Sequence, residues 1–150
     1  MNHLKLELNR EEILEKLIRS YEGYFDIERS NDMEPPLEAV CHFYVRSAKY
    51  VLLKKAELWS ATSNEHVYIF SVPELTEEIY RACEKKAYDE GMKLIDPKPG
   101  HMYTYITAVF ICDTCTPEAK KLLKKCRIYK SFHFSLHGWM DFHTVLIQRG

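Results

Sequence analysis

A run of polar and aromatic residues near the carboxyl terminus offers the most chemistry in this sequence. Its members recur at every second position and are His133, Ser135, His137, Trp139, Asp141 and His143. Mostly apolar residues stand between them, which predicts strand structure with one buried face and one polar face. Imidazoles titrate near neutral pH and coordinate ligands, and Gly138 allows a bulge that re-aims its neighbours. We predict that these six residues line a ligand-binding site; the alternative is that they are ordinary strand residues.

Cys112 and Cys115 form a C-x-x-C pair where a predicted strand gives way to a helix. A helix N-terminus lowers the pKa of a thiol, and the layout resembles a thioredoxin active site. However, no proline follows Pro117, and strands replace the expected βα unit before the motif. With His133 and His137 the pair could instead begin a zinc site, but histidines four apart on a strand are separated by about 13 Å. We favour two structural cysteines and expect no cofactor.

The predicted order of elements resembles the core of restriction-endonuclease-like proteins. That family needs an acidic residue on one strand and a D/E-x-K triplet on the next. Here the D-x-K triplet at 96–98 falls in a predicted loop, and the E-x-K triplet at 84–86 falls on a predicted helix. The order is therefore compatible with this three-layer core although its motif is missing. A metal-dependent or nuclease-like hydrolase with an atypical active site remains our alternative function.

Six basic residues cluster on or just after the third predicted helix, and they are Lys120, Lys121, Lys124, Lys125, Arg127 and Lys130. The segment 130–134 resembles part of the aromatic stretch of RNA-recognition motifs, but lacks the small residues between its aromatic rings. The net charge of the chain is −1, and acidic residues on the other two helices offset the basic ones. We therefore expect no strong binding to nucleic acid.

Three helices are predicted. The first begins after Asn9, which forms a capping box with Glu12, and ends at Gly23, which tolerates a positive φ. The second spans about 73–91, and the third begins at Pro117.

Predicted strands cover about 24–29, 39–47, 55–61, 65–71, 101–112 and two runs within 129–148. The resulting order is αββββαβαββ. It indicates an α+β fold with a mixed, mostly antiparallel sheet of six to seven strands and three helices.

Composition indicates one ordinary globular domain over 1–150, with 46% hydrophobic and 29% charged residues. The first residues contain no long apolar run, and no stretch is long enough to span a membrane. Five scattered cysteines do not suggest a disulfide framework. We therefore expect a cytoplasmic protein with an unknown small-molecule or protein partner, and a homodimer is compatible with the sequence.

Two segments of the C-terminal third, 101–107 and 131–141, resemble an uncharacterised bacterial domain family, and the similarity extends back to 24–27. The resemblance is strongest over 101–148. It implies a bacterial cytoplasmic protein and gives no residue a role. Because no nucleophile with its base, phosphate loop or metal cluster is recognisable, we interpret the chain as a non-catalytic ligand-binding, protein-binding or regulatory module.

Overall fold

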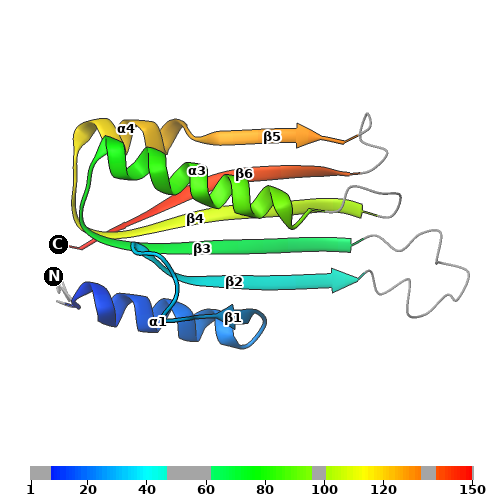
Figure 1. The fold of residues 1–150 in the computed structure, drawn as a ribbon, viewed down its shortest axis with the longest axis horizontal. Helices are drawn as coiled ribbons and strands as arrows, with labels where there is room; N and C mark the ends of the chain where they lie inside the picture. Colours follow the sequence, from blue (N-terminus) through cyan, green and yellow to red (C-terminus); the bar gives the residue numbers. More distant parts are fainter. Residues whose placement is uncertain (1–7, 47–61, 96–100, 133–137, 150) are drawn as a thin grey trace, which may run out of the picture.

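The computed structural model describes residues 8–46, 62–95, 101–132 and 138–149. Within these ranges the chain forms an α+β fold with three helices and a six-stranded sheet (Figure 1). The elements are α1 (Arg10–Glu22), β1 (Asp26–Glu28), β2 (Leu37–Arg46), β3 (Thr62–Leu75), α3 (Glu77–Lys93), β4 (His101–Cys115), α4 (Pro117–Lys125), β5 (Arg127–Ser131) and β6 (Trp139–Gln148). None of the described helices is long and apolar enough to cross a membrane.

The strand order is β1-β2-β3-β4-β6-β5, with β3, β4 and β6 parallel to one another at the centre. The other three pairings, β1 with β2, β2 with β3 and β5 with β6, are antiparallel. The sheet is therefore mixed, as predicted, but not mostly antiparallel. Parallel strands need crossover connections, and α3 provides one between β3 and β4 while α4 and β5 lie between β4 and β6.

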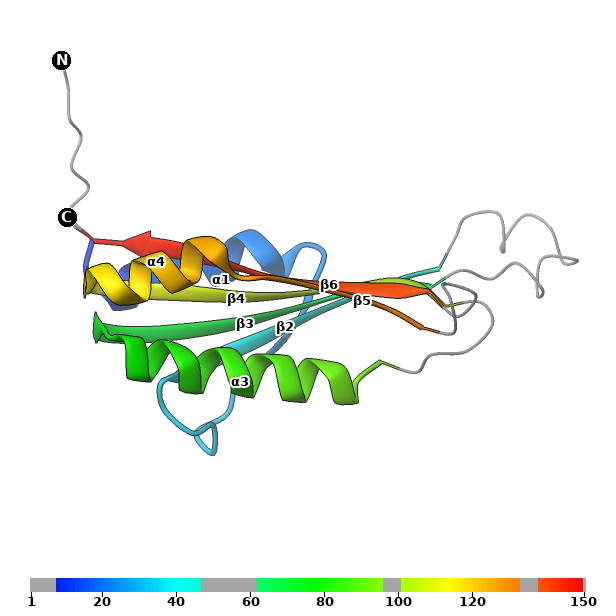
Figure 2. The same ribbon diagram turned by 90° about the horizontal axis from the view of Figure 1, so that it is seen from above.

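The two faces of the sheet are covered by different helices. Helices α3 and α4 share a core with one face, built around Phe70, Phe110 and Phe142. Helix α1 packs on the other face through Leu14 and Ile18, against buried residues of β2, β3 and β4. Figure 2 shows α1 and α3 on opposite sides of the sheet.

Helix α3 begins and ends later than predicted. Pro73 belongs to β3, which runs on to Leu75, and the N-cap is Thr76, whose hydroxyl accepts a hydrogen bond from the Ile79 N–H. Gly91 does not end the helix but is buried inside it. A Cβ at Gly91 would lie 2.6 Å from Ile106 Cδ1. Glycine is therefore needed for close approach of α3 to β4, and the sequence pattern alone looks like a helix stop.

The other helix ends are closer to prediction. The capping box of Asn9 and Glu12 is present, and α4 begins at Pro117 after the N-cap Thr116. Gly23 is the C-cap of α1, but its φ is −69°, so the expected positive φ is wrong there. The predicted strand at 55–61 lies outside the described residues.

Candidate functional site

Trp139, Asp141 and His143 of β6 share one face of the sheet because successive strand residues point to opposite sides. Between them, Met140 and Phe142 are fully buried in the core beneath α3 and α4. The three residues are therefore on the α1 side of the sheet. Gly138, directly before β6, has a φ of 86°, the left-handed conformation that favours glycine.

Two tyrosines of the neighbouring strand β4 lie beside these residues. Tyr103 is in register with Trp139, and their ring centroids are 6.1 Å apart at an interplanar angle of 25°. Tyr105 is in register with Asp141, and its ring contacts those of Tyr103 (4.9 Å) and His143 (6.4 Å). The rings thus form a continuous patch across β4 and β6.

A second feature is a row of residues that crosses four strands. Glu65 of β3 is in register with Tyr105, Tyr105 with Asp141, and Asp141 with Tyr129 of β5. Carboxylates and phenol rings therefore alternate along the row. Tyr129 is 58% exposed, so much of its ring is accessible to solvent. We call the set of Glu65, Tyr103, Tyr105, Tyr129, Trp139, Asp141 and His143 the aromatic face.

Helix α1 leaves the aromatic face open because it covers a different part of the same side. Its buried residues pack against Val109 and Ile111, in the carboxyl half of β4. The aromatic face occupies the amino halves of β4 and β6. In Figure 1, α1 lies by β1 and β2 and away from β5.

One side chain of the aromatic face is fixed by a hydrogen bond. His143 Nε2 lies 3.1 Å from the Thr107 hydroxyl on the adjacent strand. Arg127 of β5 is in register with His143 on its other side. The basic groups thus gather at one border of the face, and the two carboxylates lie within it.

Three of the six residues predicted from the sequence, His133, Ser135 and His137, lie outside the described residues. The structure brings together the other three, and adds neighbours that the sequence reasoning missed. Glu65, Tyr105 and Tyr129 come from three other strands, so only the sheet order joins them to β6. The two-residue spacing of Tyr103 and Tyr105 was the one local signal for part of this set.

Cys112 and Cys115 have the location predicted for them, and their thiol pKa values do not suit the redox alternative. Cys115 ends β4 and Thr116 caps α4. Burial raises the pKa of the Cys112 thiol to about 11, and burial also raises the pKa of Cys115. Desolvation of the thiolate therefore raises both pKa values, whereas a redox pair at this place would need a lowered thiol pKa.

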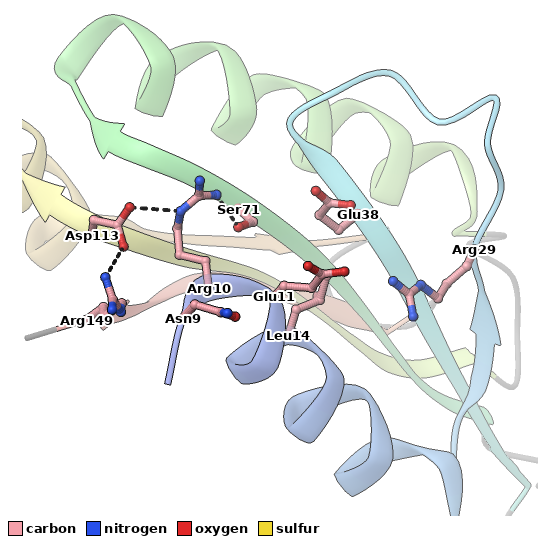
Figure 3. Close-up of a pocket in the computed structure, with 9 residues that line it drawn as sticks. All are labelled: Asn9, Arg10, Glu11, Leu14, Arg29, Glu38, Ser71, Asp113 and Arg149. Carbon is pink, nitrogen blue, oxygen red and sulfur yellow. Dashed lines mark hydrogen bonds and ion pairs between the residues drawn. The ribbon is translucent and has the colours of Figure 1, made fainter. Parts of the chain in front are cut away.

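A charged cavity of about 430 Å³ lies where the central strands end and α1 begins (Figure 3). Asp113 at the end of β4 accepts from Arg10 Nε at 3.1 Å and from Arg149 at 3.4 Å. Arg10 also donates to the Ser71 hydroxyl at 2.8 Å. The two guanidinium groups are thus engaged by the protein itself, and the network ties α1 and the end of β6 to the sheet.

No group of three histidine, cysteine, aspartate or glutamate residues within the described ranges is arranged to hold a metal ion. The described residues therefore offer no metal site for the hydrolase hypothesis, which stays a prediction.

Residues 9–149 match the family described as Domain of unknown function (DUF8052), and the chain belongs to that family. No curated protein matches the chain. No solved structure matches it either.

Proposed function

For a member of this family of unknown function, we propose a non-catalytic binding module whose aromatic face takes a cationic segment of a partner protein. The observation that carries the proposal is the row Glu65–Tyr105–Asp141–Tyr129, in which carboxylates alternate with phenol rings. Lysine and arginine side chains suit such a surface because the ammonium or guanidinium group is attracted both by a carboxylate and by the face of an aromatic ring.

The same charges argue against nucleic acid as the occupant. A strand of DNA or RNA would stack its bases on Tyr103 or Trp139, as on other aromatic sheets. Its phosphates, however, would pass over Glu65 and Asp141, and like charges held close together are repelled. A basic protein segment avoids this cost and gains from the same carboxylates.

Each individual contact on this open face is weak. An exposed cation–π contact contributes about 0.5–1 kcal/mol, and an exposed ion pair about 0.2–1 kcal/mol. A partner therefore needs several cations in one extended segment, since alternate residues of a strand repeat about every 6.6 Å on one side. Binding of this kind is strongly salt dependent.

The test is titration of a fluorescent octalysine peptide into the protein at low salt, with an octaglutamate peptide as the opposite charge. We expect octalysine to bind and octaglutamate not to. Asp141→Asn and Tyr105→Leu should each weaken octalysine binding about fivefold, which corresponds to the loss of about 1 kcal/mol. The matched control is Asp89→Asn, which removes the same charge from α3 on the other side of the sheet.

Equal weakening by Asp89→Asn and Asp141→Asn would mean that only net charge matters, and would overturn the proposal. So would octaglutamate binding as tight as that of octalysine. Circular dichroism of each variant separates loss of binding from loss of fold.

We also propose that the protein works in a reducing compartment such as a bacterial cytoplasm. All five cysteines are free thiols, including the half-buried Cys115 and Cys126. Proteins of oxidising compartments more commonly pair such residues.

A further inference from the structure

Two histidines form a direct contact on the α3 side of the sheet. His42 of β2 and His66 of β3 are cross-strand partners, and their Nδ1 atoms are 2.8 Å apart. His66 is fully buried, and its Nε2 has no hydrogen-bond partner in the described structure.

His42 also lines a groove of about 550 Å³ between α3 and the strands β1 and β2. Val40 and Leu94 contribute apolar surface to the groove. Its charged residues are Glu28 of β1 and Lys86, Glu90 and Lys93 of α3. The volume is in the range of small-ligand sites.

The contact between the two rings fixes where their protons can be. A short Nδ1–Nδ1 distance requires that one of these nitrogens carries the proton and the other accepts it. His42 Nε2 lies 4.0 Å from the Glu28 carboxylate. When His42 takes up one proton from solvent, one N–H bond forms and no group leaves. His42 then carries N–H on both nitrogens, and donates from Nδ1 to the neutral His66.

The surroundings favour His42 as the ring that carries this charge. Glu28 offers an opposite charge beside its Nε2, and the Tyr44 ring stacks on it with centroids 6.2 Å apart. His66 is buried, and burial together with the neighbouring His42 lowers the pKa of His66 to about 4. His66 therefore stays neutral and serves as the hydrogen-bond acceptor of the pair.

Protonation of His42 changes the field inside the groove. Lys86 and Glu90 form an ion pair at 2.8 Å, so their charges offset each other. While His42 is neutral, the carboxylates of Glu28 and of Asp26, the cross-strand partner of His42, oppose the positive charge of Lys93. A protonated His42 offsets one of these two negative charges, so the groove attracts an anion more strongly.

We propose that this groove binds a small carboxylic acid with an apolar body, and that binding takes up one proton at His42. The carboxylate pairs with Lys93, and the apolar body lies against Val40 and Leu94. His66 acts as a positioning residue, because it accepts the Nδ1–H of the charged ring.

Titratable or charged groups that face the pair or its groove come from four described elements: Asp26 and Glu28 from β1, Tyr44 from β2, Tyr68 from β3, and Lys86, Glu90 and Lys93 from α3. Burial and the nearby Glu90 and Glu28 raise the pKa of Tyr68, so this phenol stays neutral.

The test uses benzoate as the probe, titrated into the full chain and followed by NMR of the histidine ring protons. We expect benzoate to bind about fivefold tighter at about pH 5.5 than at about pH 8, because one opposing charge is removed. His42→Phe should abolish this pH dependence, and Lys93→Gln should weaken binding at the lower pH. The control Lys124→Gln changes an exposed lysine of α4 and should have no effect.

Two further variants isolate the role of His66. His66→Phe removes the acceptor and should move the midpoint of benzoate binding to lower pH, whereas His66→Asn keeps a hydrogen-bonding group and should move it less.

Equal affinity at both pH values overturns the proposal, as does absence of saturable binding or an equal loss with Lys124→Gln. None of these outcomes bears on the octalysine experiment, because the groove and the aromatic face are on opposite sides of the sheet.

Discussion

The two sides of the sheet use aromatic residues in opposite ways. Under α3 and α4, Phe70 and Phe110 stack with centroids 5.3 Å apart, and Tyr80 packs on Phe110. All three rings are essentially inaccessible to solvent. On the α1 side the rings of Tyr103, Tyr105 and Trp139 are also in contact, but Tyr129 of the same aromatic face is 58% exposed.

The difference lies in what covers each side. Two helices and one continuous core bury the first side, while on the second side α1 covers parts of β2 and β3 and the carboxyl half of β4. Rings that no described helix covers, such as the exposed Tyr129, gain less stability from the hydrophobic effect than fully buried rings do. We infer that the α3 side accounts for most of the stability and that the open part of the α1 side is available for binding.

The comparison is tested most strongly by removing one ring from each side. Phe110→Ala should lower the free energy of unfolding by about 3–5 kcal/mol, because it removes a buried ring and leaves a cavity. Tyr129→Ala should change it by no more than about 0.5 kcal/mol, as for other surface changes. Urea denaturation measures both. A large loss from Tyr129→Ala would show that its exposed ring packs on something essential, and would end the distinction between the two sides.

Lowering the pH should destabilise the fold through a buried histidine on the α3 side of the sheet. His66 has a pKa of about 4 in the folded protein, lowered by burial and by His42, against about 6.5 in an unfolded chain. Between these two pKa values the unfolded state binds more protons than the folded state does. The contribution of His66 to the free energy of unfolding is therefore fully present above about pH 6.5 and decreases as the pH falls toward 4. From pH 8 to pH 5 the loss should be on the order of 2 kcal/mol.

The measurement is the midpoint of urea unfolding across this range in wild type and in His66→Phe, which should have a flatter profile. His143→Phe, on the exposed part of the α1 side, is the control and should keep the wild-type slope. A His66→Phe profile as steep as that of the wild type would show that other groups cause the acid sensitivity.

Local patterns predicted the ends of helices where capping chemistry is local. Asn9 with Glu12, and Thr116 with Pro117, place two helix starts correctly. The start of α3 was wrong because Pro73 is tolerated in β3, and nothing local distinguishes that from a first helical turn. The role of Gly91 depends on Ile106 of β4, a contact that no sequence pattern contains.

The candidate site was predictable only along a single strand. The alternation in 139–143 places three side chains on one face, and that property follows from strand geometry alone. Their partners Glu65 and Tyr129 depend on strand order and register, which are set by the crossover through α3 and by the position of β5 at the edge. The His42–His66 pair was missed for the same reason, because the two residues are 24 positions apart.

The smallest effect concerns how α1 is held to the sheet. Asp113 accepts from both Arg10 and Arg149, and its side chain is 36% exposed, so water weakens these pairs. Asp113→Asn should therefore lower the free energy of unfolding by only about 1 kcal/mol. Asp89→Asn, which breaks one exposed pair with Lys85 on α3, should cost less because a single contact within a helix is lost. Thermal unfolding of both variants at low and high salt measures this difference, which should shrink as salt screens the charges. If Asp113→Asn lowered the free energy of unfolding as much as Phe110→Ala, the α1 side would depend on its ion pairs as strongly as the α3 side depends on its core. The inference that the α3 side accounts for most of the stability would then be wrong.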